Sequence, residues 1–405
     1  MDDMSNIDMR NKNSNKTNLN FFQASNKVFL LTLFMSLFIL ILLALLIFLP
    51  QNLYLSNNHS KTNQLSLASD TLFNVDSNRA RNMNVFADKY ILELRNENLN
   101  FLTFQGEVES SYAINSDNAK LDFNDNYALV SDLNGFNYYL FSQKGLVYEG
   151  RSTEKVIYST VSNEGYVALI LDTFDSKGMV RLLDPKGKHL MDYKLRERIR
   201  SGYPISLCFN PDSSKLFINI INLDGAHIQT HIHTIDLENL NISTHLNLVN
   251  SLALPKIYSP DKNLVALSNN TNFILSNLNT VSSKTSFNEI KDLSLTREEV
   301  YFLAKVEMED EFSVYSIKYS ELLGNDDDID NQPEITGPLQ VGENPYLIHS
   351  GSDYTAVATD NGIYIISNNN VFFYEMGNIE ILKMSFISKK QLLLICKDGV
   401  RLVNI

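Results

Sequence analysis

A unit of roughly 40 residues recurs along this chain and constrains the fold more than any other feature. Each copy begins with an apolar or aromatic residue, continues with a short polar turn, and ends in a strongly apolar run. Phe209–Ile218 and Tyr258–Leu267 are two clear copies. The copies begin at Phe86, Phe123, Val161, Phe209, Tyr258, Leu295, Ser350 and Phe386.

The composition of these units is typical of β-strands. From about residue 71 onward, runs rich in Val, Ile, Leu, Tyr and Phe are bounded by Asn, Asp, Gly and Ser. Asn-Gly and Asp-Gly dipeptides follow several copies, and they close tight hairpins because they tolerate positive φ angles. Three turns and four strands in roughly 40 residues form one blade of a β-propeller. The sequence therefore predicts an all-β propeller of eight blades, with seven blades as the alternative.

The last unit is too short to form a complete blade. Ile381–Ile405 has room for three strands, so a closed ring needs one strand from the N-terminal end of the domain. The candidate is Leu72–Val75, which we expect to pair with Val400–Ile405. Closure of this kind removes open sheet edges, which otherwise promote aggregation.

An uncharged apolar run precedes the repeats. Val28–Leu49 contains 22 residues, and ~20 apolar residues suffice to cross the hydrocarbon core of a bilayer. Basic residues are more frequent before the run than after it, which predicts a cytoplasmic N-terminus and an extracytoplasmic C-terminal part. The alternative is a cleaved signal peptide, but the run is long for one and lacks a small-residue cleavage site.

These features divide the chain into four segments and predict a cell-membrane protein that crosses the bilayer once. The segments are a disordered cytoplasmic tail (1–27), a transmembrane signal-anchor helix (28–49), a stalk (50–70) and an extracytoplasmic WD40-like propeller (71–405).

The segment Val156–Glu238 carries turn signatures that resemble a known bacterial family. They are Ser159–Gly165, Val180–Gly187, Phe209–Lys215 and Ile235–Glu238. They resemble the membrane-anchored, WD40-like propellers of low-GC Gram-positive bacteria known as domain of unknown function 5711. The order of anchor, stalk and propeller also matches. The resemblance implies the propeller fold and no established activity.

Charge and cysteine content narrow the function classes. The formal net charge of −13 and the absence of a basic stripe argue against binding to nucleic acid. The two cysteines, Cys208 and Cys396, lie in apolar strand-like runs. We predict that they are buried and unpaired, with a disulfide as the alternative.

One histidine cluster is a candidate metal site. The strand period of two places His227, His231 and His233 on one face, where neutral imidazoles could bind zinc or copper with a ligand from a neighbouring strand. The interpretation we favour is a polar outer face, with Ile228 and Ile232 turned to the core.

An acidic segment is the second candidate. Asp326, Asp328 and Asp330 could take calcium, but the segment lacks the ligand spacing of an EF-hand, and a solvated insertion loop is the favoured interpretation. We therefore predict no metal and no cofactor.

Enzyme motifs are missing from the chain. It has no Gly-x-Ser-x-Gly elbow, no His-Glu-x-x-His and no glycine-rich phosphate loop. The favoured function is a non-enzymatic module or scaffold that binds another envelope protein, which requires an exposed apolar patch. The alternative is a sensor or carrier that binds a small molecule or metal in a pocket at the propeller channel. A hydrolase with paired carboxylates of perturbed pKa is less favoured.

Overall fold

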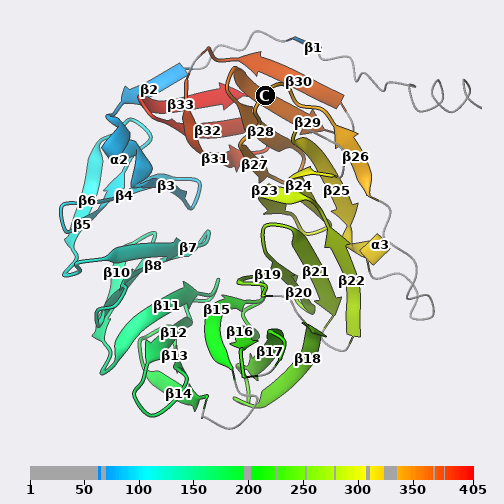
Figure 1. The fold of residues 1–405 in the computed structure, drawn as a ribbon. Coiled ribbons are helices and arrows are strands. Elements are labelled where there is room, and N and C mark those ends of the chain that lie inside the picture. The colour runs from blue at the N-terminus through cyan, green and yellow to red at the C-terminus, as the bar shows by residue number, and fades with distance from the viewer. Residues whose placement is uncertain are drawn as a thin grey trace, which may run out of the picture. The chain divides into compact units, whose positions relative to one another are not determined.

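The computed structural model describes residues 63–64, 70–195, 202–224, 226–250, 253–277, 280–306, 311–322, 335–367, 370–377 and 379–405. These residues form eight sheets arranged around a common centre (Figure 1). The prediction of an eight-bladed, all-β propeller is confirmed, and the seven-bladed alternative is wrong. Among the described residues, no helix is long and apolar enough to cross a membrane. The predicted span at 28–49 lies outside them.

The first four blades follow one another along the chain. Blade 1 contains β3 (Met83–Phe86), β4 (Tyr90–Arg95), β5 (Asn98–Leu102) and β6 (Val108–Ala113). Blade 2 contains β7 (Ala119–Phe123), β8 (Tyr127–Asp132), β9 (Asn137–Ser142) and β10 (Gly145–Arg151). Blade 3 contains β11 (Lys155–Val161), β12 (Val167–Asp172), β13 (Met179–Leu183) and β14 (His189–Lys194). Blade 4 contains β15 (Tyr203–Phe209), β16 (Lys215–Asn222), β17 (Gln229–Asp236) and β18 (Ile242–Asn250).

The next three blades continue this order. Blade 5 contains β19 (Lys256–Asp261), β20 (Leu264–Ser268), β21 (Asn272–Asn277) and β22 (Thr280–Ser286). Blade 6 contains β23 (Glu289–Leu295), β24 (Glu299–Lys305), β25 (Ser313–Lys318) and β26 (Thr336–Leu339), with the short helix α3 (Tyr319–Leu322) after β25. Blade 7 contains β27 (Leu347–Ser350), β28 (Thr355–Thr359), β29 (Gly362–Ser367) and β30 (Asn370–Glu375).

Blade 8 closes the ring with strands from both ends of the domain. It contains β31 (Ile381–Ser388), β32 (Gln391–Cys396), β33 (Gly399–Asn404) and the N-terminal strand β2 (Asp70–Asn74). The strand β2 pairs antiparallel with β33, with Asp70 opposite Leu402 and Asn74 opposite Gly399. The predicted closure is therefore confirmed, although β2 begins two residues before Leu72.

A second N-terminal segment adds to the sheet of blade 7. Strand β1 (Asn63–Gln64) pairs in parallel with the outermost strand β30, with Asn63 opposite Phe372. These two residues lie within the segment that the sequence predicts as stalk. The propeller thus recruits chain from before residue 71.

The seam between blades 8 and 1 is also fastened by polar side chains. The Lys383 Nζ donates hydrogen bonds to the backbone oxygens of Arg81, at 3.0 Å, and Met83, at 2.6 Å. Helix α2 (Ser77–Arg81) connects β2 to β3. Its Arg79 donates to the buried carboxylate of Glu93, at 2.7 Å. These contacts hold the two ends of the domain together.

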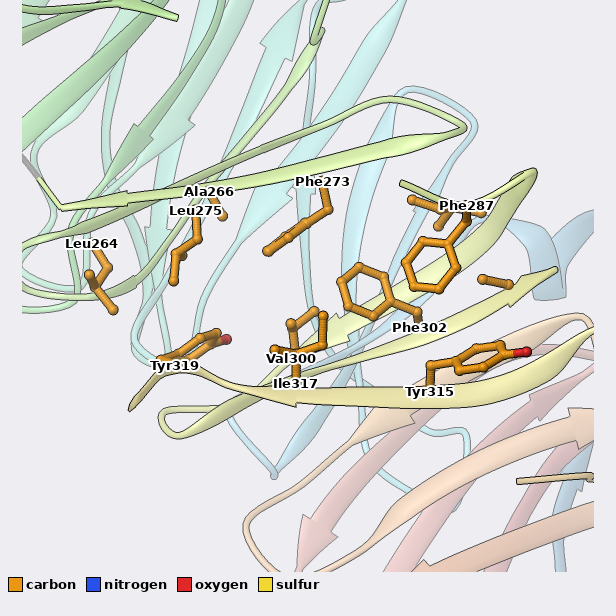
Figure 2. Close-up of a cluster of buried hydrophobic side chains, with 12 residues drawn as sticks. Leu264, Ala266, Phe273, Leu275, Phe287, Val300, Phe302, Tyr315, Ile317 and Tyr319 are labelled. Atoms are coloured by element: carbon orange, nitrogen blue, oxygen red, sulfur yellow. The ribbon is translucent and has the colours of Figure 1, made fainter. Parts of the chain in front are cut away.

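The apolar core lies between neighbouring blades. Between blades 5 and 6, the ring centroid of Phe302 lies 5.0 Å from those of both Phe273 and Phe287 (Figure 2). Burial of one such side chain contributes about 1.5–3 kcal/mol. Because each sheet faces a neighbour on both sides, the inner strands are buried on both faces, as in β20 (Leu264–Ser268), and their sequences are continuously apolar.

The two cysteines are unpaired, as predicted. Cys396 is buried, and its burial raises the pKa of the thiol to about 12. Cys208 is partly buried. Desolvation by the surrounding protein also raises the pKa of its thiol. Both side chains stay protonated at neutral pH and act as small apolar residues.

The ring has two faces that differ in the turns they carry. The first strand of each blade lies nearest the centre and the fourth lies outermost (Figure 1). Because neighbouring strands within a blade are antiparallel, the turns between strands one and two emerge on one side, which we call the first-turn face. The turns between strands two and three emerge on the other side together with the connections between blades, and we call this the second-turn face.

The repeated sequence unit coincides with the first turns. In blade 4, the Ser213 amide donates to the Asn210 carbonyl at 3.0 Å, and the Asp212 carboxylate accepts the Ser214 amide at 3.2 Å. Proline at position 211 suits such a turn because its φ angle is already fixed. The repeated sequence unit therefore predicts the positions of the turns on the first-turn face.

Candidate binding surfaces

The histidine cluster is only partly assembled. His231 and His233 lie on β17 two residues apart and so share a face, and the His233 Nδ1 lies 2.8 Å from the Tyr193 hydroxyl of blade 3. His227 precedes the strand and is exposed. Ile232 is buried as expected, but Ile228 is 39% exposed, so its predicted inward direction is wrong. The histidine face is likewise packed against blade 3 rather than forming an open outer surface.

No metal site is formed by the described part of the chain. Within it, no three or more His, Cys, Asp and Glu side chains are grouped so that they could hold a metal ion. Asp326, Asp328 and Asp330 lie outside the described residues.

An apolar patch lies on the second-turn face of blades 3 and 4. Phe174 is fully exposed, and Leu223, Tyr203 and Ile228 are 57%, 45% and 39% exposed. Phe174 lies in the turn between β12 and β13, whereas Leu223 and Ile228 lie in the connection between β16 and β17. Tyr203 begins β15. We call these four residues the apolar patch.

Lys177 joins the elements that carry the patch. It forms an ion pair with Asp224, next to Leu223, and its Nζ lies 5.3 Å from the centroid of the Tyr203 ring. The backbone amide of Lys177 donates to the Leu195 carbonyl at 2.9 Å, which braces the turn against the end of β14. The turns that carry the patch are therefore fastened to one another, while its apolar side chains remain exposed.

A close backbone approach supports this arrangement. Gly178 has a φ angle of 142°, and a Cβ atom there would lie 2.7 Å from the Pro204 ring. Only glycine allows the turn after Phe174 to lie this close to β15. The sequence signal for the patch is an aromatic residue inside a polar hairpin turn. Such a residue belongs to no motif for catalysis or metal binding.

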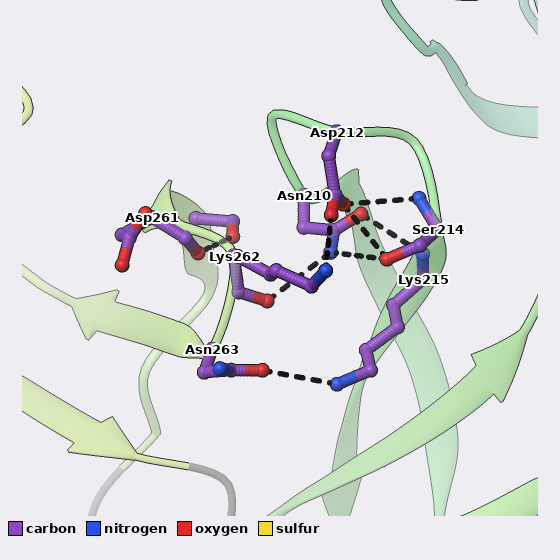
Figure 3. A network of polar contacts seen from close by, with 8 residues as sticks. Asn210, Asp212, Ser214, Lys215, Asp261, Lys262 and Asn263 are labelled. Atoms are coloured by element: carbon purple, nitrogen blue, oxygen red, sulfur yellow. Dashed lines mark hydrogen bonds and ion pairs between the residues drawn. The ribbon is translucent and has the colours of Figure 1, made fainter.

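The first-turn face of blades 2 to 5 is joined by side-chain hydrogen bonds. The Asn126 Nδ2 donates to the Asn163 carbonyl of the next blade at 3.0 Å, and the Asn163 Nδ2 donates to the Pro211 carbonyl of the blade after that at 2.9 Å. The Asn210 Nδ2 then donates to the Lys262 carbonyl at 3.1 Å (Figure 3). We call this series of contacts the turn ladder.

Ion and amide contacts reinforce the ladder between blades 4 and 5. The Lys215 Nζ donates to the Asn263 Oδ1 at 3.1 Å, and the Lys262 Nζ lies 3.1 Å from an Asp212 carboxylate oxygen (Figure 3). These polar side chains are engaged in joining blades. They stabilise the contact between neighbouring blades, so their presence on this face does not indicate a binding site.

A pocket lies on the same face, between the first turns of blades 7, 8 and 1. Its volume is about 200 Å³. Blade 1 contributes Asp88, whereas the other lining residues come from the turns of blades 7 and 8. These other residues are Gly351, Ser352, Asp353, Tyr354, Phe386, Ser388 and Lys389.

The pocket has an aromatic wall and charged edges. The ring of Phe386 is stacked on His349, with 5.8 Å between the centroids and 21° between the planes. Burial lowers the pKa of His349, so its imidazole is neutral at pH 7. The Lys389 Nζ lies 3.3 Å from an Asp353 carboxylate oxygen. Partial burial, and secondarily the nearby Asp125, raise the pKa of Asp88.

Two further carboxylates lie on innermost strands, where they join blades. The Asp122 Oδ2 accepts the Val161 amide of blade 3 at 3.0 Å, and the Asp292 Oδ2 accepts the Ile348 amide of blade 7 at 3.0 Å. Burial raises the pKa of both groups, while these hydrogen bonds oppose the rise. They belong to blades 2 and 6 and so do not form a catalytic pair.

Seven four-stranded blades and one blade with a fifth strand, closed by an N-terminal outer strand, define the class: the protein is a WD40-like β-propeller. Residues 60–331 match the model of a family of unknown function, DUF5711. The chain belongs to this family, which confirms the resemblance noted in its turn signatures. A comparison with curated proteins finds no match.

Solved structures with the same fold are distant in sequence. The C-terminal WD40 domain of Sif2 has a TM-score of 0.53 at 10% identity, covering 84% of this chain and 99% of that one. Sqt1 from Chaetomium thermophilum has the same TM-score, identity and coverages. BamB from Moraxella catarrhalis has a TM-score of 0.49 at 11% identity, covering 83% and 99%. Likeness at this identity concerns the fold alone.

Proposed function

We propose that this protein is a membrane-anchored, extracytoplasmic propeller that binds another envelope protein and has no catalytic activity. The observation that carries the proposal is the apolar patch, in which Phe174, Tyr203, Leu223 and Ile228 are exposed on braced turns. Exposed apolar side chains that gather on one face mark interaction sites more often than those scattered singly over a surface. Aromatic side chains are also the residue types that most often anchor interfaces.

The other classes have less support. A hydrolase of the carboxylate type needs two acids that share a pocket and are free to act on a substrate. Asp122 and Asp292 each accept a backbone amide on a different blade, and in the pocket at Phe386 the carboxylate of Asp353 is paired with Lys389. A metal carrier would need a cluster of ligands, and the described residues contain none. Among the alternatives, a small-molecule site retains a supporting observation, the pocket at Phe386.

Site-specific photocrosslinking in intact cells tests the proposed surface. A photoreactive phenylalanine analogue replaces Phe174 in the full-length protein, and the matched control carries it at Val108, which is 58% exposed on the outer strand of blade 1. We expect a discrete crosslinked protein from position 174 and none from position 108. Identical products from both positions, or no product from position 174, would contradict the proposal.

The energetic contribution of the patch can be measured on the same complex. Phe174→Ser should weaken capture of the crosslinked partner about thirtyfold, since an interface anchor contributes about 2 kcal/mol or more. Val108→Ser is the control and should leave capture unchanged. A partner that binds both variants equally does not use the patch.

Membrane topology is tested independently of any partner. Protease added to intact cells should digest the part of the chain after residue 49 if the propeller is extracytoplasmic. Permeabilised cells provide the control for protease sensitivity. Full protection in intact cells would rule out this topology while leaving the patch to be tested on its own.

A further inference from the structure

We propose that the pocket between the first turns of blades 7, 8 and 1 binds an organic cation, that is, an alkylammonium or guanidinium group. The site lies on the face opposite the apolar patch and does not depend on it. Three features of the pocket carry the inference: an aromatic wall, an excess of carboxylate, and a small volume.

The aromatic wall is fixed in place from behind. His349 is partly buried and stacks on one face of Phe386. Gly351 packs against the same ring, and a Cβ atom at Gly351 would lie 2.9 Å from it. A held aromatic ring at a pocket wall attracts cations through the negative charge of its face, within about 6 Å of the ring centroid.

The charges around the wall favour a positive ligand. Asp353 is already paired with Lys389 at 3.3 Å. Asp88, which blade 1 contributes to the lining, is exposed and has no ion pair or hydrogen bond with any other described residue. The lining therefore carries two carboxylates and one ammonium group, which leaves one negative charge available. A bound cation would supply Asp88 with a counterion and lie against Phe386 at the same time.

The size of the pocket limits what can enter. About 200 Å³ is smaller than the roughly 300–1,000 Å³ typical of sites for drug-sized ligands. It can accommodate a small amine or the end of a Lys or Arg side chain, and it is too small for a nucleotide. The same chemistry can thus come from a free amine or from a basic residue of another protein.

Calorimetry on the full-length protein in detergent tests the site. The probes are choline, agmatine, and a glycine-serine peptide that contains one arginine. We expect at least one probe to bind with a dissociation constant of millimolar or below, and Asp88→Asn to weaken that binding about tenfold. Binding by choline or agmatine indicates a free-amine ligand, whereas binding by the peptide alone indicates a side chain; either result supports the site.

Matched variants separate a specific site from general attraction to an acidic protein. Glu164→Gln removes an exposed carboxylate from the first turn of blade 3, away from the residues that line the pocket, and should leave binding unchanged. Phe386→Leu should weaken binding while the protein keeps its melting temperature within a few degrees, and Phe174→Ser should have no effect. Equal losses in Asp88→Asn and Glu164→Gln, or no binding by any probe at millimolar concentration, would overturn the proposal.

Discussion

The first turns of blades 2 to 5 and those of blades 7, 8 and 1 come from the same repeated unit but do different things. In the first group, Asn126, Asn163 and Asn210 each donate to a carbonyl of the next turn. In the second group, the corresponding turns carry Asp88 and Asp353, and they surround a pocket. The two regions occupy the same place in the repeated unit and differ in side-chain chemistry.

The difference follows from what each side chain can donate. An asparagine amide has two N–H donors and can bond to a neighbouring backbone oxygen, whereas an ionised carboxylate only accepts. An Asn side chain can therefore donate a hydrogen bond to the backbone of the next turn. An Asp side chain needs an N–H donor or a cation from another group. In a ring of similar units, a binding site can arise wherever the joining amides are replaced by acids.

Removal of the closing strand should have the largest effect, because the region of blades 7, 8 and 1 depends on it. In the full-length chain, replacement of residues 70–74 by a Gly/Ser segment of equal length leaves β33 paired with β32 alone and removes the strand that closes the ring. We expect the melting temperature to fall by more than about 10 °C, or cooperative unfolding to be lost.

The matched control replaces Asn63 and Gln64 of β1, which pair with blade 7 without closing the ring. This change should lower the melting temperature much less. An unchanged melting temperature after replacement of residues 70–74 would show that β2 does not hold the ring closed.

Asn210→Ala should have the next largest effect and break the turn ladder. Asn210 is 1% exposed, donates to the Lys262 carbonyl and accepts the Lys215 amide at 2.9 Å. Loss of this side chain leaves partly buried backbone groups unpaired, which costs about 1 kcal/mol or more in total. Urea denaturation measures the loss in the free energy of unfolding.

Asn126→Ala is the control for that measurement. Asn126 makes one contact of the same kind but is exposed, so water can replace the lost partner. The loss should be less than about 1 kcal/mol. Equal losses for the two variants would mean that the ladder contributes through surface contacts rather than through buried ones.

The sequence predicts the fold of this protein better than its surfaces. Blade number, first-turn positions and the closing strand follow from patterns of residues adjacent in the chain, such as Phe209–Ile218. The pocket brings together Asp88 and Phe386, which lie near opposite ends of the domain in the sequence. The apolar patch likewise combines Phe174 with Leu223. Nothing local marks such pairs, because only ring closure and blade order bring them together.

The histidine cluster shows the same limit at the scale of one strand. The period of two correctly places His231 and His233 together, but β17 begins at Gln229, so His227 falls outside the strand. Strand boundaries depend on pairing with neighbouring strands, here β16 and β18. A periodic pattern alone does not fix them.

Ala87→Gly should stabilise the protein by about 1 kcal/mol, because it relieves strain in the turn that carries Asp88. Ala87 and Asp88 have φ angles of 55° and 49°, a left-handed conformation that disfavours residues with a Cβ atom. Ala119→Gly, in strand β7, is the control and should destabilise by about 0.5–1 kcal/mol. A loss of stability in Ala87→Gly would show that this turn is not strained.

Asp122→Asn should give the smallest effect, visible as a dependence on pH. Burial raises the pKa of Asp122 in the folded protein, so the folded state favours the neutral carboxyl. The stability contributed by this group is complete below the unfolded pKa of about 3.9 and is lost as the pH rises through the folded pKa. Asparagine stays neutral, so Asp122→Asn should raise the melting temperature at pH 8 and raise it less as the pH falls towards 4.

Asp192→Asn provides a control of opposite sign on blade 3. A bidentate hydrogen bond from Arg181 lowers the pKa of Asp192, so its ionised form stabilises the fold above the unfolded pKa and loses that effect as the pH falls through the folded pKa. Asp192→Asn should therefore lower the melting temperature at pH 8 and lower it less near pH 4. If Asp122→Asn behaved like Asp192→Asn, the Asp122 charge would be a net stabilising contact with the Val161 amide, and the seam between blades 2 and 3 would depend on ionisation.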